Sequence, residues 1–474
     1  MSILKNGTVD KIYLKLETIF KYFILILTLF SFNSFFANNK YLTLASTGVA
    51  ALGAVLLLYR FVNLKKYIKF YGFIVLIAFV FAYLISSVVQ MKYGITGNIK
   101  TMIWSAFQFG ILYALDYNGD IKKERKDYFG LLTVFNVYVF INNVISIIML
   151  VTGYGKTPAV SFNKNIIGFV WGRLWGSYYD PNNGAVFCVA AIAISVYFAI
   201  KTDKVWQKIL YAIHIFISLA YIAFSDSRTG LVCLGASLIT LAFLLLRSSE
   251  KNKLKTGMKN ATSLVLAGVI AVVGVISIPT ITKTYNAIAT SVKETNQSST
   301  PVQQEQSNDP GVIGREDDQV EKDISNRRFS LWGSGIEIWK TTPIFGTTQR
   351  NITPYTLENL PDTYMVNNDK GGHFDTTHNT YIDILVCQGI LGAVIFLVFL
   401  AMVVILVARK MLFTKDYKLC NSENILMITL VVNFAVSCVF ILDVVYMNTA
   451  AAVLFWLTLG RLVKNLRMDD GKAK

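Results

Sequence analysis

Three arginines and one histidine are the residues of this chain best suited to chemistry on an anionic group. They are Arg173, Arg228, Arg328 and His378. A guanidinium group stays charged at any working pH and matches phosphate or carboxylate oxygens with two parallel hydrogen bonds. An imidazole, with an ordinary pKa of about 6.5, is neutral often enough at pH 7 to accept a proton. Together these residues predict a site that holds negative charge and removes a proton beside it.

Each of these residues also has a simpler structural explanation. Arg228 lies in a polar run, Ser225 to Gly230, where a turn between two helices would pair it with Asp226. His378 precedes an apolar segment and could begin a helix there, but Asn379 or Thr377 would be the better cap because either side chain accepts backbone hydrogen bonds. Asp383, about one turn inside the same segment, is a functional candidate because a carboxylate at that depth faces a cavity or a partner.

The elements that must position these residues are membrane helices. Of 474 residues, 54% are hydrophobic and only 16% charged, and the apolar runs approach the ~20 residues that cross a ~30 Å hydrocarbon core. The sequence therefore predicts an all-α polytopic membrane protein with about twelve spans. The predicted spans are residues 20–36, 41–59, 68–90, 97–116, 128–152, 183–200, 206–224, 229–246, 261–280, 380–408, 424–442 and 446–462.

Lysines and arginines in the short connections predict the orientation. With a cytoplasmic N-terminus, every densely basic short segment falls in the cytoplasm, as does the C-terminus, and the three arginines and His378 fall outside. Topology and anionic lipid headgroups then account for the net charge of +16, so nucleic acid is not an expected partner. We expect a multi-pass protein of the plasma (inner) membrane with its site on the outer face.

This topology divides the chain into three parts. Residues 1–280 hold spans 1 to 9, residues 281–378 form one large outer loop, and residues 379–474 hold spans 10 to 12 and a cytoplasmic tail. Within the loop, residues 291–323 are polar and lack aromatics, which predicts disorder. Residues 327–341 instead predict an amphipathic helix at the membrane interface or over a cavity, because Phe329, Trp332, Ile336 and Trp339 recur at helical spacing.

Motifs for common cofactor and metal sites are missing from the sequence. It contains no glycine-rich phosphate loop, no zinc-binding His-Glu-x-x-His pattern and no nucleophile elbow. The five cysteines form neither a disulfide framework nor a metal-spaced cluster. We therefore expect no metal and no cofactor, and a site built from arginines, a histidine and scattered carboxylates.

Four short motifs resemble those of one family when they are taken in order and on the outer side. They are Gly176-x-Tyr-Tyr-Asp180-Pro181-Asn182, Ser225-x-Ser227-Arg228, Arg328-x-x-x-Trp332 leading to Pro343 and Gly346, and His378-Asn379-x-Tyr381 followed by Gly389-Ile390-x-Gly392. The set resembles the O-antigen ligase and polymerase family, the Wzy-like and WaaL-like integral membrane glycosyltransferases. The resemblance covers roughly residues 125–460.

This resemblance implies a GT-C-like fold and transfer of glycan from a polyprenyl (undecaprenyl) pyrophosphate carrier, without an essential metal. Arg228 and Arg328 match the arginines that hold the pyrophosphate, with Arg173 a third candidate, and His378 matches the histidine that activates the acceptor hydroxyl. Supporting positions are Asp226, Asp180, Asn182, Asn379 and Asp383. The implied partners are the lipid-linked glycan donor, a glycan acceptor, membrane lipids, and flippase and chain-length regulator proteins.

The sequence thus predicts a capsule or O-antigen polymerase that joins lipid-linked repeat units by inverting transfer. The first alternative is a ligase that moves finished glycan to a terminal acceptor, since donor and site would be the same. The alternative of another class is a flippase or transporter, which would show broken helices with polar residues near the middle of the bilayer. The polar candidates here cluster at the outer ends of the spans, which favours the enzyme.

Overall fold

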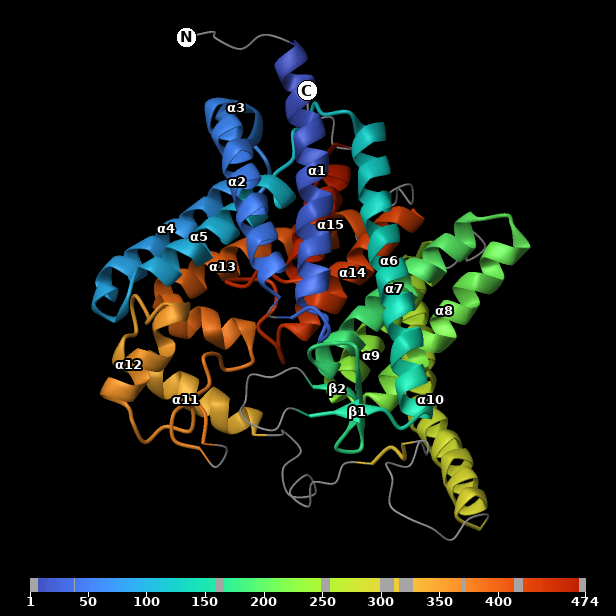
Figure 1. The fold of residues 1–474 in the computed structure, drawn as a ribbon. Helices are drawn as coiled ribbons and strands as arrows, with labels where there is room; N and C mark the ends of the chain where they lie inside the picture. The colour runs from blue at the N-terminus through green and yellow to red at the C-terminus, as the bar shows by residue number, and fades with distance from the viewer. Residues whose placement is uncertain are drawn as a thin grey trace.

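The computed structural model describes residues 7–37, 39–157, 166–248, 256–298, 311–314, 327–368, 371–412 and 421–468. These residues form a helical bundle with one small sheet (Figure 1). The helices are α1 Gly7–Ser31, α2 Lys40–Val62, α3 Leu64–Tyr67, α4 Phe73–Val89, α5 Thr96–Phe107, α6 Ile121–Val151, α7 Pro181–Lys201, α8 Val205–Phe224, α9 Arg228–Ser248, α10 Thr256–Ser298, α11 Arg328–Thr341, α12 Ile352–Asn359, α13 Thr380–Met411, α14 Ser422–Ser437 and α15 Ala450–Met468.

Helices occupy each of the twelve segments predicted as spans, although not all of them are long enough to cross a membrane. Within the described ranges, seven helices have the length and hydropathy for a crossing, namely α2, α6, α7, α8, α9, α10 and α13. The apolar helices α4 and α14 are shorter. Burial separates a central helix, α7, from peripheral α2 and α10, which expose apolar side chains as lipid contact requires. The chain is a multi-pass helical membrane protein.

Several predicted span ends differ from the helix ends, including those of α1 and α15. The span predicted over 97–116 ends as an α-helix at Phe107 and continues as a π-helix, Gln108–Tyr113. Helix α14 stops at Ser437 instead of 442, and a non-helical segment leads to α15. Helix α10 runs past 280 to Ser298 because no glycine or proline after Pro279 interrupts it.

The longer α10 also corrects the prediction for the first part of the large loop. Residues 291–298, predicted to be disordered, continue α10. Of the rest of the predicted disordered stretch, residues 299–310 and 315–323 lie outside the described residues, whereas 311–314 are placed against the sheet region, with Gly314 N donating to Gly172 O at 3.0 Å. The segment 327–341 contains α11, which begins at Arg328 and ends at Thr341.

A three-stranded antiparallel sheet, which the all-α prediction lacked, follows α6. Strands β1 Gly155–Lys156, β2 Ile167–Val170 and β3 Arg173–Gly176 lie in that order. The strands are too short and too rich in glycine to give an alternating pattern in the sequence. Gly176 packs so closely on α6 that a Cβ there would lie 2.0 Å from Ser146 Oγ. The sheet is therefore fixed to the bundle immediately before α7 begins.

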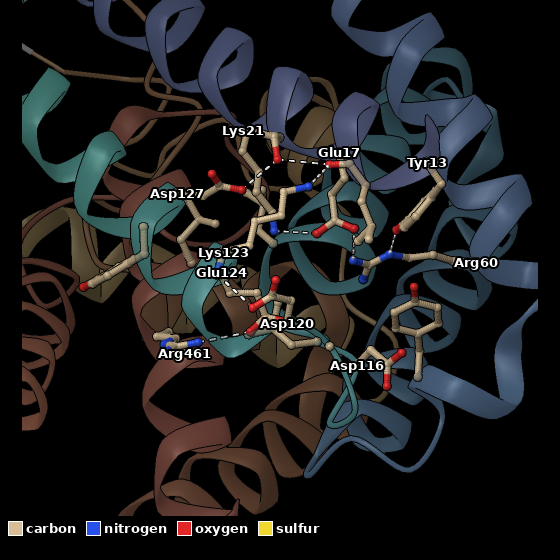
Figure 2. A pocket seen from close by; sticks show the side chains of 18 of the residues that line it. Tyr13, Glu17, Lys21, Arg60, Asp116, Asp120, Lys123, Glu124, Asp127 and Arg461 are labelled. Atoms are coloured by element: carbon tan, nitrogen blue, oxygen red, sulfur yellow. Dashed lines mark hydrogen bonds and ion pairs between the residues drawn. The ribbon is translucent and has the colours of Figure 1, made fainter. Parts of the chain in front are cut away.

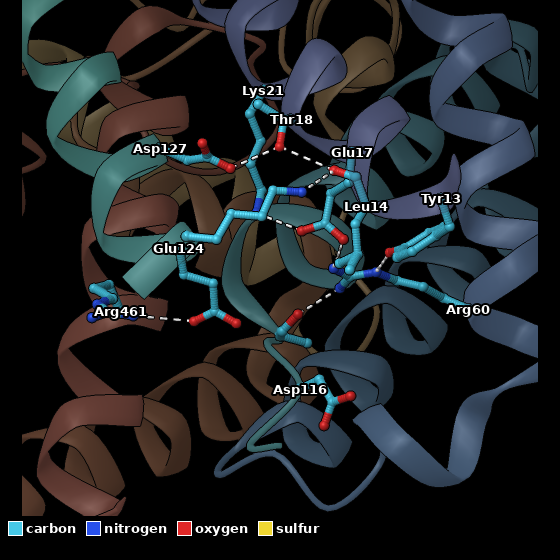
Figure 3. A network of polar contacts seen from close by, with 12 residues as sticks. Tyr13, Leu14, Glu17, Thr18, Lys21, Arg60, Asp116, Glu124, Asp127 and Arg461 are labelled. Atoms are coloured by element: carbon cyan, nitrogen blue, oxygen red, sulfur yellow. Dashed lines mark hydrogen bonds and ion pairs between the residues drawn. The ribbon is translucent and has the colours of Figure 1, made fainter. Parts of the chain in front are cut away.

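The opposite end of α6 borders a polar cavity of about 250 Å³ (Figure 2). Figure 3 shows the Glu17 carboxylate of α1 between Lys21, also on α1, and Arg60 of α2. The Glu17 carboxylate is 2.5 Å from Lys21 Nζ and 3.0 Å from Arg60 Nη2. Arg60 Nε also donates to Tyr13 Oη at 2.6 Å. Arg461 of α15 pairs with Glu124 of α6 at 3.1 Å. This network joins the start of α1 and α6 to the end of α15. With 31 residues, α6 separates it from the sheet by about 45 Å.

Candidate active site

The turn between α8 and α9 is the centre of the candidate site. Helix α8 ends at Phe224 and α9 begins at Arg228. Ser227 Oγ accepts a hydrogen bond from Gly230 N at 3.0 Å, which caps the start of α9. Asp226 adopts a left-handed backbone conformation, φ +46°, that aspartate tolerates better than most residues. The predicted turn is therefore present, and it places the half-buried Arg228 in the first turn of a helix.

The other two arginines reach this same turn from distant parts of the chain. Arg173, on β3, donates from Nε to Ser225 O at 2.9 Å. Arg328, at the start of α11, donates from Nη2 to Thr229 Oγ1 at 3.3 Å. The structure thus brings all three predicted arginines together around five residues.

Helix stability does not explain this gathering of positive charge. Arg228 and Arg328 each occupy the first position of a helix. That end of the helix macrodipole is positive, so a cation there is unfavourable, and neighbouring cations repel one another as well. The same combination of helix N-termini and guanidinium groups favours a bound anion.

The histidine segment lies immediately before α13. Of the two predicted cap residues, Asn379 rather than Thr377 caps this helix, and its Oδ1 accepts from Tyr381 N at 3.0 Å and Ile382 N at 3.2 Å. His378 does not cap it. Its backbone is left-handed, φ +54°, and its half-buried ring meets Phe374 edge to face at a centroid distance of 5.9 Å. The histidine therefore occupies an unfavourable backbone conformation that helix capping does not require.

Asp383 holds the backbone of this histidine segment. Its fully buried carboxylate accepts from Thr376 Oγ1 at 2.5 Å and from Thr377 N and Oγ1, both at 2.8 Å. Thr376 Oγ1 in turn accepts from His378 N at 3.1 Å. The deep carboxylate thus has a structural partner, and it shapes the turn that presents the imidazole.

The segment between α14 and α15 connects the histidine segment to the arginines. Thr380 donates from N to Cys438 O and from Oγ1 to Ile441 O, both at 2.8 Å. Phe440 lies between Cys438 and Ile441 in the sequence, and the guanidinium carbon of Arg328 is 5.4 Å from the centroid of the Phe440 ring. His378, two residues before Thr380, and Arg328 are therefore positioned by the same short segment.

Two predicted supporting residues lie at the start of α7. Asp180 caps α7 by accepting from Asn182 N at 2.7 Å and Asn183 N at 3.1 Å. Asn182 Oδ1 accepts from Ser227 Oγ at 3.0 Å, which ties α7 to the arginine-bearing turn. Asn182 thus supports the α8–α9 turn directly, whereas Asp180 fixes the start of α7 that carries Asn182.

Asp443 is a site residue that the sequence prediction missed. It is 1% exposed, and Asn183 Nδ2 is 3.5 Å from its Oδ1. Its Oδ2 is buried with no hydrogen-bond partner among the residues described. Burial, together with the nearby charge of Asp180, raises the pKa of Asp443 to about 7. The signal in the sequence was a carboxylate inside an apolar run, the same signal that identified Asp383.

The acidic and histidine side chains do not form a metal site in the described ranges, where no three His, Cys, Asp or Glu residues are arranged to hold an ion. His373, five residues before His378, is exposed, as is Asp375. The site therefore combines a cluster of guanidinium groups with one presented imidazole and two buried carboxyl groups.

A known family model matches part of the chain. Residues 213–397 match the family model described as O-antigen ligase. No curated protein matches the chain. The matched stretch contains Arg228, Arg328, His378 and Asp383, whereas Arg173, the start of α7 and Asp443 lie outside it. The predicted resemblance to this family is confirmed over residues 213–397, a stretch that covers less than half of this multi-pass membrane protein.

Proposed function

We propose that the protein is a polysaccharide polymerase that joins repeat units carried on polyprenyl pyrophosphate at the outer face of the plasma membrane. The observation that carries this proposal is the convergence of Arg173, Arg228 and Arg328 on one turn, with His378 presented nearby. The O-antigen ligase family match supports glycosyl transfer in a membrane. A GT-C-like fold with a capping outer loop is part of the same proposal.

The arginines hold the lipid pyrophosphate of the donor. Negative charge builds up on this group as its bond to the anomeric carbon breaks. Guanidinium groups aimed at the phosphate oxygens stabilise that charge without Mg²⁺, and the more so where water is partly excluded. Arg228 and Arg328 are the main ligands, and Arg173 is the third.

His378 accepts the proton of the acceptor hydroxyl. The hydroxyl oxygen attacks the anomeric carbon, the carbon–oxygen bond to pyrophosphate breaks, and the proton passes to the imidazole. Direct displacement inverts the anomeric configuration, so no covalent glycosyl-enzyme intermediate is needed. Asp383 contributes by holding the turn that carries the imidazole.

The orientation rests on the basic residues at the other end of the bundle. The polar cavity there carries Lys21, Arg60, Lys123 and Arg461. Basic residues collect on the cytoplasmic side of membrane proteins, so we place that end, with both termini, in the cytoplasm. The arginine cluster, at the far end of α6, then faces outward, where the lipid-linked repeat unit and membrane lipids meet it.

A reaction with purified protein and a single substrate tests this function. Given only a lipid pyrophosphate-linked repeat unit and EDTA, the protein should produce a ladder of longer lipid-linked products, because one substrate serves as both donor and acceptor. A ligase would give no product until a different acceptor is added, and a flippase would move the lipid without changing its mass. Loss of synthesis in EDTA that Mg²⁺ or Mn²⁺ restores would contradict stabilisation by arginines alone.

A further inference from the structure

Two tryptophans flank Arg173 on the β2–β3 hairpin. Trp171 is in the two-residue turn of the hairpin, and Trp175 lies on β3. Their rings meet edge to face, with centroids 6.0 Å apart and planes at 75°. On β3, Arg173 and Trp175 share the less buried face, while Leu174 and the glycine after Trp175 are buried. The hairpin therefore presents a guanidinium group and an indole pair on one side.

Trp171 occupies its position at a cost to stability. Its φ is +54°, and the following Gly172 has φ +65°. Turns with two positive φ values favour asparagine and glycine, because a side chain clashes with the backbone in this region. The indole is also 55% exposed. Neither the backbone conformation nor burial of apolar surface explains a tryptophan here.

Trp175 holds an unused hydrogen-bond donor at the same place. Its Nε1 is buried and has no acceptor among the residues described. Its carbonyl accepts from Tyr221 Oη at 3.0 Å, so the strand is fixed to α8 close to the arginine-bearing turn. An indole N–H in this state is satisfied by an incoming oxygen acceptor, such as a hydroxyl group.

A second arginine of the site has similar neighbours. On α11, Trp332 follows Arg328 by one helical turn, and its Nε1 is also buried with no acceptor in the described part of the chain. Phe329 meets Trp332 edge to face at a centroid distance of 5.4 Å. Both arginines that reach the α8–α9 turn from outside it are therefore accompanied by an aromatic pair with an available indole donor.

We propose that Trp171 and Trp175 form a sugar-binding platform for the glycan whose pyrophosphate the arginines hold. One face of a pyranose ring carries C–H groups that stack on the electron-rich face of an indole, and its hydroxyls accept from an indole N–H. This inference rests on the proposed function and adds its glycan subsite. Membrane anchoring is the competing explanation for an exposed outer tryptophan.

Binding of a lipid-free glycan tests the platform independently of catalysis. The probe is the oligosaccharide released by mild acid from the cell's own lipid-linked glycans, titrated calorimetrically into purified full-length protein. Trp171→Gly should weaken binding roughly tenfold while leaving the melting temperature unchanged or higher, because glycine adopts φ +54° without strain. Trp171→Leu keeps an apolar membrane contact and should weaken binding equally. Trp206→Leu, at a 58%-exposed tryptophan at the start of α8, is the matched control and should bind as wild type.

The outcomes separate this inference from the proposed function. If wild-type protein fails to bind the oligosaccharide, or if Trp171→Gly and Trp171→Leu bind it normally, the platform is wrong even where the ladder forms. If Trp171→Leu binds the probe normally and Trp171→Gly only reduces membrane retention, Trp171 is an anchor. If the probe binds through Trp171 but no ladder forms, the platform stands and the polymerase proposal fails.

Discussion

At the scale of single residues, the choice of arginine over lysine is the most direct test of the phosphate-binding role. Arg228→Lys and Arg328→Lys keep the charge but lose the paired donors that match phosphate oxygens. We expect each to lower the rate of ladder formation at least about tenfold, the effect of losing roughly 1.4 kcal/mol of stabilisation. Arg350→Lys, at an exposed arginine on the 3₁₀ turn Gln349–Asn351, should retain full activity. Normal rates in both site variants would mean that the arginines serve only the fold or the topology.

His373 and His378 provide a matched pair for the proposed proton-transfer step. His378→Ala should abolish polymer while the protein stays in the membrane, because it removes the proposed base and little packing. His373→Ala, five residues earlier at an exposed position, should leave polymer unchanged. Polymer length on gels, in a deletion strain complemented with each variant at equal expression, measures both. Chains of normal length in the His378→Ala strain would remove this imidazole from the mechanism.

Asp443 predicts a pH-dependent stability. Its pKa is raised from 3.8 to about 7 by burial, followed by the charge of Asp180, so the folded protein holds a proton that the unfolded chain releases. The wild type should therefore lose stability as pH rises from about 4 to about 7, by at most about 4 kcal/mol. Asp443→Asn should lack this loss and melt higher than wild type at pH 8, with the difference vanishing near pH 4. If the melting temperatures of wild type and Asp443→Asn change in parallel from pH 4 to pH 8, the pKa of Asp443 is not raised by the fold.

The sequence predicted the roles of some of these residues better than others. Asn379 was one of two residues predicted to cap α13, because capping depends on local residue type. The hydrogen-bond partners of Asp383 lie within seven residues of it in the sequence. The left-handed backbone at His378, which separates these partners from the helix, leaves no pattern in the sequence. Asp443 was missed because a continuous apolar run conceals the end of α14 at Ser437.

At the scale of elements, α11 shows what periodicity can and cannot predict. The spacing of Phe329, Trp332, Ile336 and Trp339 indicates a helix. The buried side of that helix is a different one, made of Leu331, Ser334, Gly335 and Ile338. Small residues allow α11 to approach α13 closely, a membrane packing mode that hydrophobicity does not reveal. The aromatic side is left for the interface or the glycan.

Gly335 tests this packing directly. A Cβ at this position would lie 2.6 Å from Thr377 Cγ2 and 3.0 Å from Ile382 Cγ2, so Gly335→Ala should push α11 away from the histidine segment. We expect a lower melting temperature and reduced ladder formation. Gly333→Ala, on the same helix with nothing within 4 Å, should be neutral or slightly stabilising, since alanine favours helix. Equal effects of the two substitutions would exclude close packing at Gly335 as the cause.

At the scale of the whole molecule, the site depends on the meeting of segments that are far apart in the sequence. The turn at Ser225, the strand at Arg173 and the helix at Arg328 are brought together only by the tertiary fold. Composition and charge predicted that all three share one side of the membrane. Hydrophobicity alone does not predict which helix ends are in contact, because every apolar span is equally suited to lie in the membrane.

The polar network at the other end of the bundle predicts where global stability is held. Glu17 is 8% exposed and pairs with both Lys21 and Arg60, so Glu17→Gln leaves a buried guanidinium without its counter-charge. We expect unfolding to become easier by about 3–5 kcal/mol, as when one partner of a buried ion pair is removed. The matched control is Glu358→Gln in the exposed pair Lys92–Glu358, 2.7 Å apart, where solvent screens the charges and no change is expected. Thermal melts in detergent measure both variants. If Glu17→Gln melts like the Glu358→Gln control, the buried network does not hold α1 to α2, and this end of the bundle is stabilised by apolar packing alone.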